Sequence, residues 1–105
     1  MLYSKRELIT TKLQKIQENE IYMKLPFFDK ISSLRQKYEI SKIVALIERF
    51  IIPAHEQNAL KDYLLLEFDR YKLLNPSELT DFTPTNQQID QVIDDLTYLI
   101  KVIQA

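Results

Sequence analysis

The sequence predicts an all-α protein: an antiparallel bundle of four helices, or of five, forming a single domain over residues 1–105. Apolar residues recur at three- and four-residue steps along most of the chain, as they do on one side of an α-helix. Prolines separate the periodic segments, and glycine is absent. A fold with few left-handed backbone positions is therefore favoured, because glycine is the usual residue at such positions.

The segment from Thr85 to Ala105 has the clearest helical pattern. Its opposite side is acidic, with Asp90, Asp94 and Asp95. We expect the apolar side to be buried and the three carboxylates to be hydrated. The apolar residues are Ile89, Val92, Ile93, Leu96, Leu99, Ile100 and Ile103.

The first helix has a recognisable start, because Ser4 and Glu7 have the spacing of a capping box. The pattern loses phase at Asn19, so we place the end of this helix between Asn19 and Lys24. Its expected buried side consists of Ile9, Leu13 and Ile16.

Prolines at positions 26 and 53 mark joints in the middle of the chain. Between them, two apolar patterns out of phase with each other predict either one long helix or two helices, the second capped by Ser41. Pro53 is expected to end this segment. Tyr38 lies on the first pattern and is expected in the core. Glu48 is the acidic residue expected to lie nearest to the core.

The helix expected to start at Ala54, which Asn75 and Pro76 end, is apolar around much of its circumference. Such a helix lies at the centre of a bundle or at an interface between subunits. A loop from Asn75 to Thr83 then leads into the last helix, which begins at Thr83 or Thr85. The leucines and the phenylalanine that widen the apolar side are Leu64, Leu65, Leu66 and Phe68.

Residues suited to catalysis or metal binding are missing or isolated. The chain has no cysteine and one histidine, His55, and a zinc-protease helix would need a second histidine where Ala59 stands. The Glu-x-x-His pairs of di-iron proteins are absent, as are glycine-rich phosphate loops. We therefore expect no enzymatic activity, no cofactor and no metal, with His55 facing solvent in the first turn of its helix.

The overall charge favours no charged polymer as a partner. With 14 basic and 15 acidic residues the net charge is -1, so we expect no binding to nucleic acid, although Lys5, Lys12 and Lys15 share one side of the first helix. No segment is apolar enough to insert into a membrane, and no signal-peptide pattern follows Met1. Together with the lack of cysteine, these features predict a cytoplasmic protein.

The C-terminal part is the acidic part. From Asn75 onward five acidic residues accompany one basic residue, whereas basic residues are in excess before it. Clustered charge of one sign steers encounters with partners. We therefore predict a partner-binding surface on this loop and helix, made of Glu78, Asp81, Phe82, Asp90, Asp94 and Asp95.

The loop ending in Phe82 and Thr83, with the amphipathic helix after it, resembles the immunity proteins that protect producers of pediocin-like bacteriocins. The resemblance implies a cytosolic antiparallel four-helix bundle without catalytic activity. Such proteins recognise the bacteriocin-bound sugar-transporter receptor from inside the cell, with the C-terminal half setting specificity. The resemblance rests on the length of the chain, the lack of cysteine and six residues in about a fifth of the chain: Leu79, Phe82, Thr83, Ile89, Ile93 and Leu96.

A second hypothesis follows from the leucines at positions 64–66. Their excess suggests a dimeric regulatory or adaptor bundle that binds another protein. Under the first hypothesis the partner is a membrane receptor complex reached from the cytosol. The sequence leaves both a monomer and a homodimer open.

Overall fold

Every regular element is helical in the part of the chain that this computed structural model describes, residues 4–76 and 84–105. The all-α prediction is confirmed. Elements α4, η1 and α5 follow one another without a break, so five helices longer than one turn are present besides the single turn α2. The elements are α1 (Lys5–Gln17), α2 (Glu20–Met23), α3 (Pro26–Gln36), α4 (Ile40–Leu46), the π-helical turn η1 (Ile47–Ile51), α5 (Ile52–Glu56), α6 (Leu60–Leu74) and α7 (Asn86–Gln104).

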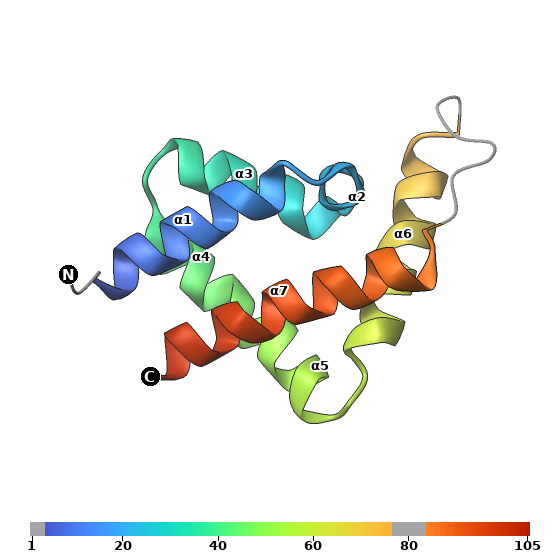
Figure 1. The fold of residues 1–105 in the computed structure, drawn as a ribbon. Coiled ribbons are helices and arrows are strands. Elements are labelled where there is room, and N and C mark those ends of the chain that lie inside the picture. The colour runs from blue at the N-terminus through green and yellow to red at the C-terminus, as the bar shows by residue number, and fades with distance from the viewer. Residues whose placement is uncertain (1–3, 77–83) are drawn as a thin grey trace.

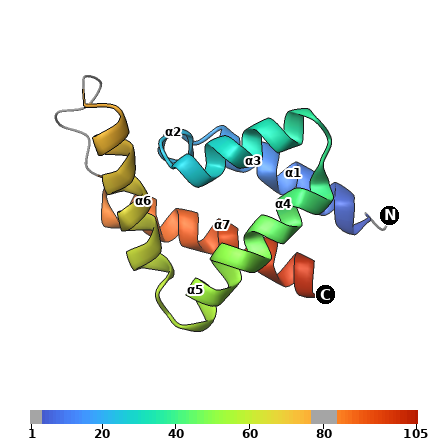
Figure 2. The same ribbon diagram turned by 180° about the vertical axis from the view of Figure 1, so that it is seen from behind.

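Helices α1 and α7 run antiparallel, so the N- and C-terminal ends lie at the same end of the molecule (Figure 1). The side chain of Lys5 donates to the backbone oxygen of Ala105, with 3.3 Å between the two atoms. Helix α6 stands at the opposite end of the molecule, as the two views in Figures 1 and 2 show. The molecule measures 46 × 30 × 23 Å along its principal axes.

The core is one continuous cluster of apolar side chains. The predicted buried side of α1 is confirmed, and so is that of α7, where only Ile93 is partly exposed. Leu13 of α1 and Leu96 of α7 are completely buried. These two sides meet because an apolar stripe on each helix is removed from water when the helices pack together.

Both predicted helix starts have side-chain caps. The hydroxyl of Ser4 accepts from the backbone N–H of Glu7 at 3.1 Å. Of the two alternatives for the last helix, Thr85 is the cap: its hydroxyl accepts from the N–H of Gln88, whose side chain accepts in turn from the N–H of Thr85. These reciprocal bonds satisfy two backbone donors that the first turn of a helix leaves free.

The segment between the two prolines forms two helices, separated at Lys37–Glu39. Tyr38 takes a left-handed conformation with φ 58° and is 80% exposed, so its expected place in the core is wrong. The N–H of Tyr38 donates to Arg35, and that of Glu39 donates to Leu34, which is the Schellman pattern that ends a helix. Ser41 is not the cap, because α4 begins after Glu39.

The expectation that Pro53 ends its segment is wrong, because the helix continues through it to Glu56. A proline lacks an N–H group, and its ring clashes with the carbonyl four residues earlier in a regular helix. The π-helical turn η1 lies immediately before it, and there the N–H of Ile52 donates to Ile47, five residues back. This wider turn changes the hydrogen-bond pattern ahead of the proline, so the helix passes it without ending.

The break comes instead at Asn58, with φ 54°. The N–H of Asn58 donates to His55 and that of Ala59 donates to Ala54, a second Schellman pattern. His55 therefore lies in the last turn of α5 and is partly buried, and its expected place in an exposed first turn is wrong.

Candidate functional site

The residues predicted to form the acidic partner surface are not equivalent. Glu78, Asp81 and Phe82 lie outside the described residues. Asp90 and Asp94 are exposed on successive turns of α7, as expected. The next residue along the chain, Asp95, points to a different flank of the helix.

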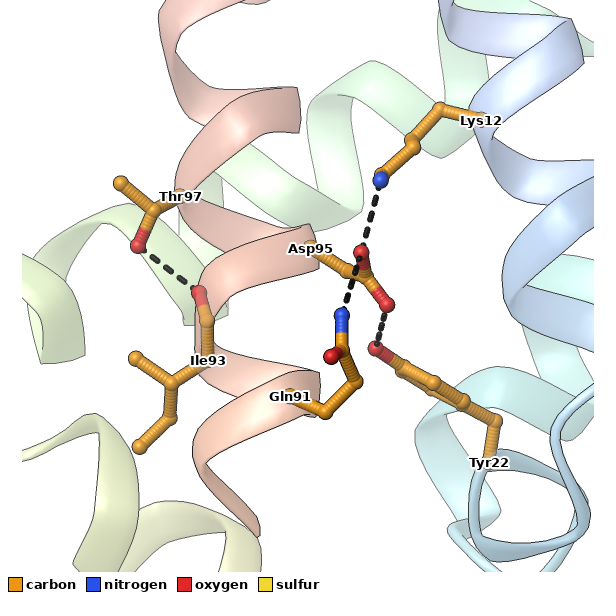
Figure 3. A network of polar contacts seen from close by, with 6 residues as sticks. All are labelled: Lys12, Tyr22, Gln91, Ile93, Asp95 and Thr97. Carbon is orange, nitrogen blue, oxygen red and sulfur yellow. Dashed lines mark hydrogen bonds and ion pairs between the residues drawn. The ribbon is translucent and has the colours of Figure 1, made fainter. Parts of the chain in front are cut away.

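Asp95 joins three helices through its carboxylate (Figure 3). The hydroxyl of Tyr22 in α2 donates to Oδ2 at 2.8 Å, and Nζ of Lys12 in α1 lies 2.6 Å from Oδ1. Gln91 adds a weak contact, with 3.4 Å between its Nε2 and Oδ1. The Asp95 side chain is only 14% exposed, so the expectation of a fully hydrated carboxylate is wrong for this residue. Packing of α1 and α2 against α7 covers this flank.

The electrostatics of the hydrogen bond between Tyr22 and Asp95 favour a structural role for Asp95. Burial raises the pKa of the Tyr22 hydroxyl, and its hydrogen bond to Asp95 and the charge of that carboxylate raise it further. Tyr22 therefore stays a neutral donor to an ionised acceptor, a strong type of hydrogen bond. Because its oxygens are engaged within the molecule, Asp95 is not free to contact a partner in this arrangement.

Helix α6 has an exposed apolar side as well as a buried one. Leu64 and Phe68 belong to the core, whereas Leu66, Leu73 and Leu74 are 64%, 81% and 67% exposed. We call these three residues the outer leucines. Leu66 and Leu73 are two turns apart, so they lie on the same side of the helix. The broad apolar pattern predicted for this helix thus divides into a core side and an unpartnered side.

A second feature of α6 is a buried acid. Glu67 is 4% exposed, whereas Glu48, the acid expected nearest the core, is exposed on η1. The reason is helical spacing: Glu67 follows Leu64 by three residues and Tyr63 by four, which places it toward the inner side of α6. That spacing is the signal by which the sequence indicates Glu67.

Glu67 lines a small hollow between α3, η1 and α6, with a volume of about 140 Å³. The walls include the rings of Phe27, Phe50 and Tyr63, and we call this space the aromatic hollow. Nη1 of Arg70 lies 3.1 Å from Oε1 of Glu67, while Oε2 accepts no hydrogen bond from the described residues. Burial raises the pKa of Tyr63 to about 12, and the charge of Glu67 and a hydrogen bond to Glu67 contribute to the rise, whereas the charge of Arg70 opposes it.

A larger, open hollow of about 490 Å³ lies between α1 and the joint at Tyr38. Arg6 and Arg35 contribute positive charge to its lining, and Glu7 contributes negative charge. Arg35 donates to the side-chain oxygen of Gln17. No lining side chain of this hollow is fully buried, which distinguishes it from the aromatic hollow with Glu67.

Within residues 4–76 and 84–105, no three His, Cys, Asp or Glu side chains come together in a way that could hold a metal ion. In the same ranges, no helix combines the length and the apolar character needed to cross a membrane.

The chain matches no family model, and comparison with curated proteins and with solved structures finds no match. The resemblance to bacteriocin immunity proteins stays a prediction from the residues.

Proposed function

We propose that the protein is a non-enzymatic helical bundle of the dimeric regulatory or adaptor kind, which associates with a second copy of itself through the outer leucines of α6. The observation that carries the proposal is the exposure of these three side chains, each at least 64%, beside a core that buries most other large aliphatic residues. Clustered exposed apolar surface on a water-facing helix is typical of interaction sites. This supports the dimeric regulatory or adaptor bundle among the functions that the sequence predicts.

The occupant proposed for this surface is a second copy of the chain. Leu66 and Leu73 have the seven-residue spacing at which two helices pack along a shared seam. Exposed charges of both signs lie close to them on α6, Asp69 beside Arg70 and Lys72. An interface with two-fold symmetry needs a surface that is complementary to itself, and a helix bearing both signs of charge can meet that need.

Sedimentation equilibrium tests this proposal. The wild-type chain is expected to be a dimer, and the double variant Leu66→Lys/Leu73→Lys is expected to be a monomer with unchanged helical content. Tyr38→Lys is the control, since it places one such positive charge at an exposed aromatic residue on another part of the surface. A wild-type chain that stays monomeric at high concentration would contradict the dimer.

A second candidate is an immunity-type protein of the cytoplasm that recognises a membrane receptor complex without entering the membrane. Its contact surface would be Asp90 and Asp94 together with Glu78, Asp81 and Phe82. The supporting observation is that Asp90 and Asp94 remain exposed on one side of α7, whereas Asp95 is bound to Lys12. Two exposed carboxylates on adjacent turns suit a basic partner.

Expression in a bacteriocin-sensitive strain tests this candidate. Protection against a pediocin-like bacteriocin is expected, and Asp90→Asn/Asp94→Asn is expected to reduce it. The matched control is Asp62→Asn/Asp69→Asn, which removes the same charge from α6. If the wild-type chain protects against no pediocin-like bacteriocin, this candidate is wrong, while the result leaves self-association through α6 to be judged by sedimentation.

A further inference from the structure

The aromatic hollow combines three rings with a buried carboxylate. The centroid of the Phe27 ring lies 6.3 Å from that of Phe50 and 6.4 Å from that of Tyr63, both in edge-to-face geometry. Glu67 forms part of the lining from α6. A water molecule needs about 10–15 Å³ of such space, so about 140 Å³ admits a group of several heavy atoms.

The carboxylate of Glu67 has unused capacity for hydrogen bonds. An ionised carboxylate has about four acceptor positions, of which the contact with Arg70 uses one and a hydrogen bond from the hydroxyl of Tyr63 uses a second. Oε2 accepts no hydrogen bond from the described residues although Glu67 is 4% exposed. Because a buried charged acceptor without donors is unfavourable, an N–H group that reached this carboxylate would gain a strong hydrogen bond.

The surroundings of this carboxylate favour a positively charged donor. The faces of aromatic rings attract cations, and Phe50 and Tyr63 supply rings beside the acid; the guanidinium of Arg49 already lies 5.1 Å from the centroid of the Phe50 ring. Burial raises the pKa of Tyr63 to about 12; the charge of Glu67 raises it more than the charge of Arg70 lowers it, and a hydrogen bond to Glu67 adds to the rise. The group that fits is an ammonium with N–H bonds, because a fully methylated nitrogen cannot donate.

The exposed edge of the hollow is positively charged, opposite in sign to the carboxylate of Glu67. Lys30 of α3 and Arg70 of α6 both line the hollow and are exposed. They disfavour a bare amine and favour a ligand that also bears a carboxylate, to which ammonium and guanidinium groups donate readily. We propose that the aromatic hollow binds a small α-amino acid, with its ammonium group on Glu67 and its carboxylate toward Arg70 and Lys30. This site uses none of the outer leucines, and Arg70 is the residue that it shares with the surface proposed for the dimer.

Titration of the ¹⁵N-labelled chain with L-alanine, followed by NMR, tests the site. Saturable shifts are expected at the amides of Tyr63, Glu67 and Arg70. Methylamine lacks the carboxylate, and glycine betaine lacks the N–H donors. Each is expected to bind at least about tenfold more weakly than L-alanine, which is the factor associated with losing one hydrogen bond to a charged group.

Two variants locate the binding groups. Glu67→Gln keeps the shape of the side chain and is expected to weaken L-alanine binding at least about tenfold, whereas Glu48→Gln, the same change at an exposed acid of η1 outside the hollow, leaves it unchanged. Lys30→Gln, at an exposed position, is expected to weaken L-alanine but not methylamine, so the test does not depend on the folding of Glu67→Gln. No saturable shift with L-alanine, equal binding of methylamine, or equal losses in Glu67→Gln and Glu48→Gln would each overturn the proposal.

Discussion

Tyr22 is the largest completely buried side chain in the described part of the molecule, and its hydroxyl depends on the carboxylate of Asp95. Asp94 and Asp95 are neighbours in sequence but point about 100° apart around α7. One therefore faces solvent and the other faces α1 and α2. The sequence indicates an acidic side of this helix, but which part of it becomes covered depends on where α1 and α2 pack. That information lies in the tertiary arrangement and not in the periodicity of α7.

Replacing Asp95 with alanine is expected to lower the free energy of unfolding by about 1–3 kcal/mol, because it leaves a buried hydroxyl without an acceptor. Lys12 loses its ion pair in the same variant. Asp94→Ala, one residue away and exposed, is the control and is expected to change stability by no more than about 0.5 kcal/mol. Urea unfolding measures both. Equal losses in the two variants would show that the contacts of Asp95 add nothing to stability.

Tyr63 is expected to make stability depend on pH in the alkaline range. Its pKa is about 12 in the folded chain, against an ordinary value of 10.0. Its contribution to stability is therefore complete below pH 10. Between pH 10 and 12 the unfolded chain releases the proton and the folded chain retains it, so stability falls as the pH rises. Tyr63→Phe is expected to make this fall shallower in urea unfolding over that range, and an unchanged slope would contradict the prediction.

At the scale of the elements, the breaks between α3 and α4 and between α5 and α6 contain no glycine. Tyr38 and Asn58 each occupy the left-handed position of a Schellman pattern. The absence of glycine correctly favours helices, but it hides these joints, because glycine is the residue by which a helix end is usually recognised. Pro53 suggests a helix end where the structure has none, since the π-helical turn before it lets the helix continue. Capped starts such as Thr85 are easier to predict because their signal is local.

Tyr38 is expected to carry a conformational cost at its joint. A side chain with a Cβ atom is unfavourable at φ 58° by about 1–2 kcal/mol, and glycine is not. Tyr38→Gly is therefore expected to be more stable than Tyr38→Ala by about 1 kcal/mol. The comparison is matched, because both variants remove the same exposed ring. Thermal unfolding of the pair measures the difference, and an alanine variant as stable as the glycine variant would mean that the joint is not strained.

For the whole molecule, helical periodicity predicts the fold class and much of the core but not its surfaces. The buried sides of α1 and α7 follow from their own patterns. The outer leucines do not, because α6 is apolar on several sides and its pattern alone cannot select the one that faces the core. The sequence pattern does not predict the aromatic hollow either, since Phe27, Phe50 and Tyr63 come from three separate elements. Sites assembled across elements need the packing, which local patterns do not specify.

Because one apolar cluster joins helices from both ends of the chain, the molecule is expected to unfold in a single cooperative step. Leu96→Ala, at a completely buried position of α7, is expected to lower the free energy of unfolding by about 2–5 kcal/mol. Gln87→Ala, at an exposed position of the same helix, is the control and is expected to cost less than about 0.5 kcal/mol. Far-ultraviolet circular dichroism reports the helices, and tyrosine fluorescence reports packing, since the chain has no tryptophan. The two signals should give the same urea midpoint in each variant. Separate midpoints would mean that α6 or another part unfolds independently of the core.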